Sequence, residues 1–210
     1  MQLPADIHTH HRGRPDAVLS LSPPEALALL ASAEAQPFSL ALHPWRLTGP
    51  DDVAAFLAAA ARCAGDARLR AVGECGLDPA GPCDVAVQAE AFRTALATAR
   101  DLALPTVVHC VRRWEAMLQA VRAVWGNEGA RRAAAAGCPV IVHGFRKGPD
   151  LAARLVAQGF GISLGEHFNP AVPALVPRGK LFAETDESAL PIAEIRKNIY
   201  LRGGNLETTA

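Results

Sequence analysis

Several features that would point to particular functions are scarce or missing in this sequence of 210 residues. Aromatic residues make up 5% of the chain, so no platform for stacking nucleic-acid bases is indicated. Lys and Arg number 21, as do Asp and Glu, and the resulting formal net charge of zero excludes a global attraction to nucleic acid or to a membrane surface. No apolar run reaches the ~18–20 residues that span a bilayer.

Cysteine is present, but not in the spacing of a metal-binding or disulfide framework. The five cysteines are an odd number and contain no Cys-x-x-Cys pair. The amino terminus also lacks a basic segment followed by an apolar run, because Pro4, Asp6 and the histidines interrupt the first ten residues. We therefore expect a cytoplasmic protein without a secretory signal, whose cysteines are free thiols in a reducing compartment.

The apolar segments that are present are of two kinds, and they alternate along the chain. Eight short runs have the composition of buried strands: Ala5–Thr9, Ala17–Leu21, Phe38–His43, Leu69–Gly73, Thr106–Cys110, Val140–His143, Gly161–Leu164 and Leu181–Thr185. Apolar residues at helical spacing predict helices over Pro24–Ala35, Asp51–Cys63, Val85–Leu104, Trp114–Trp125, Asp150–Gln158 and Ser188–Leu201. Strands that alternate with helices indicate a parallel sheet.

Eight strands in a chain of this length favour a single compact (β/α)₈ barrel of the TIM type over an open α/β sheet. One connection departs from this plan, since only six residues, His11 to Asp16, separate His10 from Ala17. They are too few for a crossover helix, so we expect the helix after strand one to be missing. The carboxyl-terminal segment after Asp186 is also short, with 24 residues. We predict one domain over residues 1–210, acting as a monomer.

Side chains that bind metals follow the strand runs at the same end. In Asp6-Ile7-His8-Thr9-His10, the two histidines share one face of an extended segment, because side chains alternate along a strand. Four further candidates lie at the ends of strands four, five, six and eight: Glu74, His109, His143 and Asp186. The carboxyl ends of parallel barrel strands emerge on one face, so we expect these six side chains to converge.

Each of these six residues alone has a plainer explanation, as a buried core histidine or a helix-capping carboxylate. Together, four imidazoles and two carboxylates buried without a metal would leave unpaired charge, at a cost of several kcal/mol. They exceed the needs of one tetrahedral ion, so we predict two divalent metal ions, with Glu74 as the candidate bridge. Mixed nitrogen and oxygen ligands suit Zn, Mn, Fe or Ni, and Mg if waters complete the shell, which leaves the metal identity open.

Two of the cysteines directly follow predicted ligands, Cys75 after Glu74 and Cys110 after His109. The period of two along a strand turns both thiols to the side of the barrel that faces the helices. We predict that both are small core residues and neither nucleophiles nor ligands.

The ordered blocks Asp-Ile-His-Thr-His, Leu-His-Pro, Gly-Glu-Cys-Gly-Leu-Asp, Val-His-Cys, Val-His-Gly-Phe and Glu-Thr-Asp resemble those of the TatD-type metal-dependent hydrolases. That family is often described as DNases and belongs to the amidohydrolase superfamily. The resemblance covers nearly the whole chain and implies a (β/α)₈ barrel with a divalent-metal site. By position it implies one ion held by His8, His10, Glu74 and Asp186, and another held by Glu74, His109 and His143.

The same resemblance implies that Asp186 accepts the proton of the attacking water, and Asp186 and Glu74 are our predicted catalytic residues. It also implies that His43, which precedes a proline, lies in the pocket wall and contacts substrate. Basic residues gather in the loops after strands one, three, five and six, and from these we predict substrate contacts by Arg12, Arg46, Arg112 and Arg146. Such a cluster favours an anionic substrate, such as single-stranded DNA ends or small phosphate esters.

Three functions fit this reading of the sequence. The leading one is metal-dependent hydrolysis of phosphoester bonds, either nuclease-like or on small phosphodiesters. The loops after strands five and six depart from the family pattern, with Val111-Arg112-Arg113 after the first and Gly144-Phe145-Arg146 after the second. A C–N or C–O bond hydrolase on the same barrel, such as an amidase, deaminase or lactonase, is therefore the alternative. A barrel that holds metal without catalysis is the third.

Overall fold

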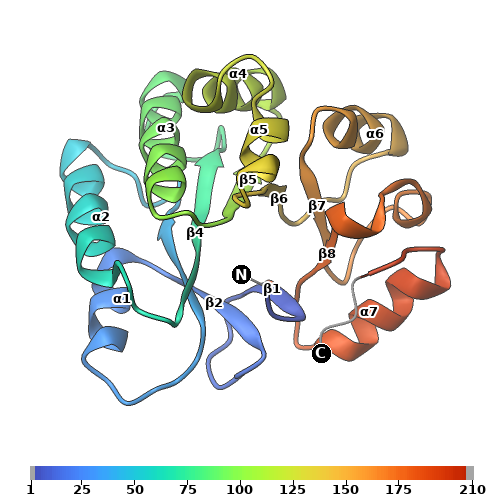
Figure 1. The fold of residues 1–210 in the computed structure, drawn as a ribbon, viewed down its shortest axis with the longest axis horizontal. Coiled ribbons are helices and arrows are strands. Elements are labelled where there is room, and N and C mark those ends of the chain that lie inside the picture. Colours follow the sequence, from blue (N-terminus) through green and yellow to red (C-terminus); the bar gives the residue numbers. More distant parts are fainter. Residues whose placement is uncertain (1–2, 207–210) are drawn as a thin grey trace.

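The computed structural model describes residues 3–206 and has eight parallel strands at its centre, with helices around them (Figure 1). The strands are β1 (Asp6–Thr9), β2 (Ala17–Leu21), β3 (Phe38–Leu42), β4 (Leu69–Leu77), β5 (Thr106–Cys110), β6 (Val140–Val142), β7 (Gly161–Leu164) and β8 (Leu181–Ala183). They pair in sequence order, and every pairing is parallel. The predicted (β/α)₈ architecture is confirmed as a nearly closed barrel.

Helices cover the outside of these strands. Within residues 3–206 they are α1 (Pro23–Leu30), α2 (Pro50–Cys63), α3 (Val85–Asp101), α4 (Trp114–Trp125), α5 (Ala130–Ala135), α6 (Pro149–Ala157) and α7 (Ile192–Leu201). A loop joins β1 to β2, as predicted, and two 3-10 turns, η1 (Pro173–Leu175) and η2 (Arg178–Lys180), stand between β7 and β8. In the described part of the chain, no helix has the length and apolar character needed to cross a membrane.

The seam between β8 and β1 is closed by a few strong contacts. The Asp186 N–H donates to the His8 carbonyl at 2.9 Å, and the His10 N–H donates to the Asp186 carbonyl at 3.1 Å. The buried carboxylate of Asp6 accepts from the backbone N–H of Thr185 at 3.0 Å and from its hydroxyl at 2.7 Å. Burial raises the pKa of Asp6 to about 6, against the opposing effect of these hydrogen bonds. The seam therefore places the first and last candidate ligands side by side.

One strand boundary differs from its prediction in a way that matters for the site. β4 continues to Leu77, beyond the predicted end at Gly73, because its backbone pairs with β5 as far as Cys110. Glu74 therefore lies inside a strand and not after one. A residue inside a strand has its side chain direction set by the pleat, which holds it more firmly than a loop does.

Three helices are shorter than predicted, and the one expected over Val85–Leu104 ends at Asp101. The helix expected over Pro24–Ala35 ends at Leu30. The helix expected over Ser188–Leu201 begins at Ile192, with Pro191 as its N-cap. A proline pushes the preceding residue towards extended geometry, so the chain before Pro191 does not join the helix.

Two glycines allow β4 to approach β5 closely on either side of Glu74. Gly73 has a φ of +133° and Gly76 a φ of +144°, conformations that other residues rarely adopt. A Cβ atom at Gly73 would clash with the carbonyl oxygen of Val107, and one at Gly76 would clash with that of His109. The two glycines therefore bring the Glu74 segment directly against the His109 strand.

The apolar core lies between the strands and the helices. Its largest fully buried side chains include Phe38, Phe56, Phe92, Phe145 and Phe160. Cys75 and Cys110 belong to this core, on the helix-facing side that strand alternation predicts, and all five cysteines are free. Burial raises the pKa of Cys110 to about 12, which removes its thiolate near neutral pH.

Candidate metal centre

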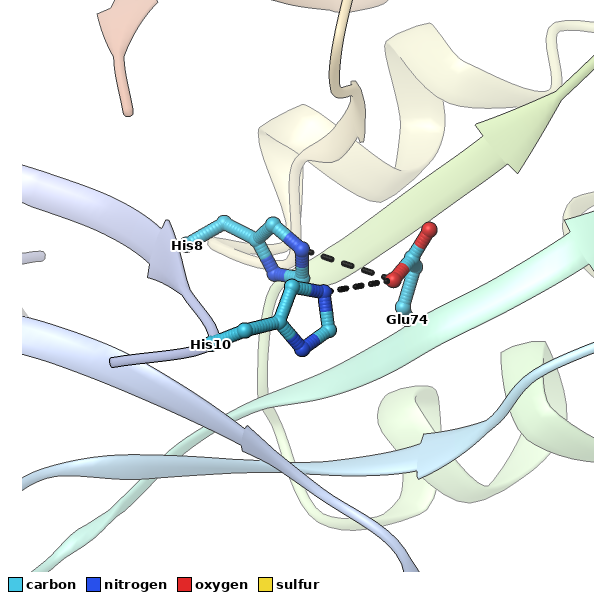
Figure 2. A group of neighbouring side chains, drawn as sticks. All are labelled: His8, His10 and Glu74. Carbon is cyan, nitrogen blue, oxygen red and sulfur yellow. Dashed lines mark ion pairs between the residues drawn. The ribbon is translucent and has the colours of Figure 1, made fainter. Parts of the chain in front are cut away.

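The first cluster of predicted ligands forms where β1 faces β4. Figure 2 shows His8 and His10 with both rings aimed at the same oxygen of Glu74. The Nε2 atoms of His8 and His10 each lie 3.4 Å from Glu74 Oε2. The same two atoms lie 3.8 and 3.6 Å from Asp186 Oδ1, at the end of β8. We call His8, His10, Asp186 and Glu74 Oε2 the first ligand group.

The other oxygen of Glu74 faces a second set of histidines. Oε1 lies 2.7 Å from His109 Nδ1 on β5 and 2.7 Å from His143 Nε2 after β6. These two nitrogens are 3.4 Å apart. We call His109, His143 and Glu74 Oε1 the second ligand group. One carboxylate thus offers a separate oxygen to each group, which is the arrangement that a bridging ligand requires.

The residues of the first ligand group fit a divalent cation. His8 is fully buried, and neither of its ring nitrogens has a hydrogen-bond partner in the described part of the chain. An unpartnered buried polar atom costs about 1–3 kcal/mol, which a metal bond to Nε2 would remove. Ligand atoms around a tetrahedral ion with bonds of ~2.0–2.2 Å stand about 3.3–3.6 Å apart. The separations of 3.4 to 3.8 Å between these nitrogens and oxygens are close to that range.

Electrostatics hold Glu74 ionised. Burial alone would raise its pKa, but the charge of His143 and hydrogen bonds from His10, His109 and His143 hold the pKa well below its usual range. Burial would lower the pKa of His143, but Glu74 and Glu184 on its two sides raise that pKa well above its usual range. Because metal ions bind the neutral imidazole, a metal ion that binds His143 would displace a proton from it.

His43 also approaches Glu74, and its hydrogen bonds give it a different role from the ligands. His43, Glu74 and His109 are close enough together to hold an ion. However, His43 Nδ1 accepts a hydrogen bond of 3.1 Å from the Trp45 N–H, so the neutral ring carries its proton on Nε2. That Nε2 lies 3.1 Å from Glu74 Oε1 and donates to it. His43 therefore acts as a proton donor in the pocket wall and has no free lone pair for a metal.

A cavity of about 790 Å³ opens from these residues towards β2, β3 and the start of α1. Side chains of the centre line one end, with His10, Glu74 and Asp186 among them. Apolar groups line much of the remainder: Leu19, Leu21, Pro23, Pro24, Ala41, Leu42 and Ala55. Trp45 stands beside His43 in this lining with 57% of its surface exposed. A volume of this size accommodates a ligand as large as a nucleotide.

Comparison with known proteins identifies the family of this chain. The family model named TatD related DNase matches residues 10–198. The chain belongs to this family. A search among curated proteins finds no match.

Solved structures of the TatD family share the fold of this chain. The TatD homologue YJJV from Escherichia coli K12 has 21% identity and a TM-score of 0.65, covering 90% of this chain and 85% of its own. A TatD family hydrolase from Entamoeba histolytica has 17% identity and a TM-score of 0.64, covering 88% and 73%. An uncharacterized amidohydrolase from Saccharomyces cerevisiae has 16% identity and a TM-score of 0.60, covering 80% and 63%. At these identities the likeness concerns the fold alone.

The four predicted arginines divide into two pairs in this TatD-family barrel. Arg12 and Arg46 line the large cavity, where Arg12 pairs with Glu34 at 3.3 Å and Arg46 with Glu25 at 3.5 Å. Arg112 and Arg146 lie outside that cavity. Arg112 is exposed after β5, and Arg146 lines a smaller cavity of about 200 Å³ that shares Asp186 with the large one. The arginines predicted to gather at one site therefore lie apart, two in the large cavity, one in the small cavity and one on the surface after β5.

Two buried carboxylates that our sequence analysis did not name as site residues stand behind the second ligand group. Asp78 Oδ2 lies 2.9 Å from His109 Nε2, and Glu184 Oε1 lies 3.5 Å from His143 Nδ1. A signal for Glu184 was present, because strand alternation places it on the same face as Asp186 two residues later. Asp78 follows Glu74 by four residues in the Gly-Glu-Cys-Gly-Leu-Asp block, so the same alternation applies to it.

Proposed function

We propose that this TatD-family protein is a divalent-metal-dependent hydrolase that cleaves phosphoester bonds, either at single-stranded DNA ends or in small phosphate esters. The observation that carries the proposal is the placement of Glu74, with Oε2 facing His8 and His10 and Oε1 facing His109 and His143. Two ions held on either side of such a carboxylate form the clamp used in phosphate-ester hydrolysis. We propose the first and second ligand groups as the residues that hold them.

Divalent ions held by these residues would lower the pKa of bound water and neutralise charge that develops on phosphoryl oxygens. The chain's own residues supply the proton transfers. Asp186 borders both the ligand cluster and the cavity, so its carboxylate can accept the proton of the attacking water and deliver it to the leaving oxygen. From the wall of the same cavity, the Nε2–H of His43 donates to Glu74 Oε1 and so helps to orient that carboxylate. Arg12 and Arg46 are placed to receive the anionic part of the substrate.

The test is hydrolysis of a single-stranded DNA oligonucleotide and of bis(4-nitrophenyl) phosphate, each with Mg²⁺, Mn²⁺ or Zn²⁺ and with or without chelator. We expect turnover that chelator abolishes and that Asp186→Asn removes. Glu194→Gln is the control, because this exposed carboxylate on α7 lines neither the large cavity nor the small one. Absence of chelator-sensitive turnover on both substrates would contradict the proposal.

A second function is hydrolysis of C–N or C–O bonds by the same centre. Two observations favour it: the apolar lining of the large cavity, and the pairing of both cavity arginines with glutamates, which reduces their pull on an anion. A panel of uncharged amides and lactones separates the two functions. Chelator-sensitive turnover of that panel, with none on phosphodiesters, would replace the phosphoester proposal.

A further inference from the structure

Asp78 is held by an extensive set of hydrogen bonds beside the second ligand group. The residue is 4% exposed and follows directly after β4. Its backbone N–H donates to Gln88 Oε1 at 2.8 Å, and its carbonyl accepts from Gln88 Nε2 at 2.9 Å. Its Oδ1 accepts from the Ala80 N–H at 2.9 Å. Gln88 is itself buried on α3, so the helix fixes the position of the Asp78 carboxylate.

The remaining oxygen of Asp78 has two partners. Oδ2 lies 2.9 Å from His109 Nε2 and accepts a hydrogen bond of 2.9 Å from Trp45 Nε1. An ionised carboxylate only accepts hydrogen bonds, so this contact requires the His109 proton to be on Nε2. Nδ1, on the other side of the ring, faces Glu74 Oε1 at 2.7 Å and needs a proton there when no metal is present, whereas with a metal ion at Nδ1 the neutral ring would keep its proton on Nε2 and turn its lone pair towards the ion. A carboxylate behind a metal-facing histidine sets the ring orientation and raises the basicity of the coordinating nitrogen.

The neighbouring histidines lack this support. His143 Nδ1 lies 3.5 Å from Glu184 Oε1, and it has no hydrogen-bond partner in the described residues. His43 also carries its proton on Nε2. In His43, however, the backbone N–H of Trp45 places that proton by donating to Nδ1. His109 is therefore the histidine of this set whose far nitrogen donates to a side-chain carboxylate, and the contrast offers controls within one molecule.

We propose that Asp78 is a positioning residue that holds His109 with Nε2 protonated and Nδ1 free to bind a metal ion. Asp78 Oδ2 also accepts a hydrogen bond from Trp45, which lines the large cavity, so one oxygen links Trp45 to His109. The inference rests on the second ligand group being a metal site, which is part of the proposed function, but it does not depend on which bond the protein cleaves.

The decisive variant is Asp78→Asn, because its one carbonyl oxygen cannot accept both from the Ala80 N–H and from His109 and Trp45, and its NH₂ group accepts no hydrogen bond. Trp45→Phe is the matched control, since it removes the bond to Trp45 and leaves Asp78 bound to His109. Two readouts are used on the full chain: the ¹⁵N NMR shifts of the His109 ring, which report the tautomer directly, and Zn²⁺ titration by calorimetry. Circular dichroism verifies that each variant is folded.

In the Zn²⁺-loaded wild-type protein we expect His109 to carry its proton on Nε2 alone. In Asp78→Asn we expect a mixture of His109 tautomers. We also expect the Zn²⁺ affinity of the second ligand group to fall about 10- to 100-fold, as for other residues that support metal ligands. In Trp45→Phe we expect the wild-type tautomer and a Zn²⁺ affinity within about twofold of wild type, since the bond between Asp78 and His109 remains.

Two results would overturn the inference. One is a Zn²⁺-loaded wild-type His109 without a proton on Nε2, which can be measured even if Asp78→Asn does not fold. The other is a folded Asp78→Asn with unchanged tautomer and Zn²⁺ affinity. Absence of phosphodiesterase activity in the wild-type protein would count against the proposed function alone, because neither NMR nor calorimetry depends on turnover.

Discussion

The two ligand groups around Glu74 are built differently. In the first group, His8 is buried without a hydrogen bond on either ring nitrogen, among the described residues, and its Nε2 stands 3.4 Å from Glu74 and 3.8 Å from Asp186. In the second group, His109 and His143 are within 2.7 Å of Glu74, and each has a buried carboxylate on its far side. The second group is held together by the protein's own hydrogen bonds and charges.

The two ligand groups would hold an ion by different means. The second group is arranged by contacts among protein side chains, whereas the first leaves the buried ring nitrogens of His8 without a partner among the described residues, and a cation bound at Nε2 would supply one. We therefore expect the first group to depend on metal for its stability and the second group to keep its geometry without it. The following predictions test that contrast, from the largest expected effect to the smallest.

Replacing the shared carboxylate should affect both groups. In Glu74→Gln, the neutral amide no longer bridges the groups, so we expect loss of bound metal and a fall in chelator-sensitive turnover of about 10³-fold or more. Metal content by mass spectrometry and turnover on the active substrate check this. Glu194→Gln, an exposed glutamate on α7 that does not line the cavity, serves as control. Retention of both ions in Glu74→Gln would show that the carboxylate is not a bridge.

In the presence of chelator, replacing His143 should lower the free energy of unfolding more than replacing His8. His143→Leu leaves Glu74 and Glu184 buried without their shared counter-charge, which should lower the free energy of unfolding by about 3–5 kcal/mol. His8→Leu replaces a ring without hydrogen bonds by a side chain of similar volume, at a cost below about 1.5 kcal/mol. Urea denaturation measures both variants. Equal destabilisation would contradict the contrast between the groups.

Metal binding should stabilise the folded protein through both groups. At Zn²⁺ concentrations about 100 times the dissociation constant, one site adds about 2.7 kcal/mol to the free energy of unfolding. In His8→Leu we expect Zn²⁺ binding at the first ligand group to add no stability, while binding at the second group still raises the free energy of unfolding. Thermal denaturation at fixed protein concentration, with and without Zn²⁺, tests this. A full Zn²⁺ effect in His8→Leu would place the binding elsewhere.

The arginines allow a smaller test of how substrate reaches the centre. Arg46 lines the large cavity, and Arg146 lines the small one. If an anionic substrate occupies the large cavity, Arg46→Gln should raise KM about two- to fivefold without a matching fall in kcat, as expected for a screened, exposed charge. Arg146→Gln should leave KM unchanged. The reverse pattern in steady-state kinetics would move the substrate to the small cavity.

The thiols next to the second ligand group should show no reactivity. Burial raises the pKa of Cys75 far above its usual range and the pKa of Cys110 to about 12. A thiol is neutral below its pKa, so Cys110 is ionised to only about one part in 10⁴ at pH 8. Iodoacetamide should label the partly exposed Cys83 before either of them, as mass spectrometry can show. Rapid native labelling of Cys110 would instead assign it a chemical role.

Much of the fold could be predicted because it follows from local pattern. Short apolar runs and helical spacing indicated the eight strands, and the six residues between His10 and Ala17 excluded a first helix. The convergence of His109, His143 and Asp186 followed from one rule, that parallel strands end on the same face. Element ends were less predictable, since the length of β4 depends on its pairing with β5 and not on its own composition.

The sequence by itself determined which side chains could meet, through strand alternation and the order of ligand-bearing blocks from Asp6 to Asp186. Only the tertiary structure decided what each of them does. The Trp45 N–H places the proton of His43, and Asp78 places that of His109. The arginines that line the large cavity are Arg12 and Arg46 and not Arg146. Alternation fixes the face on which a side chain lies, whereas tautomer, rotamer and charge state depend on atoms that distant segments bring within about 3 Å.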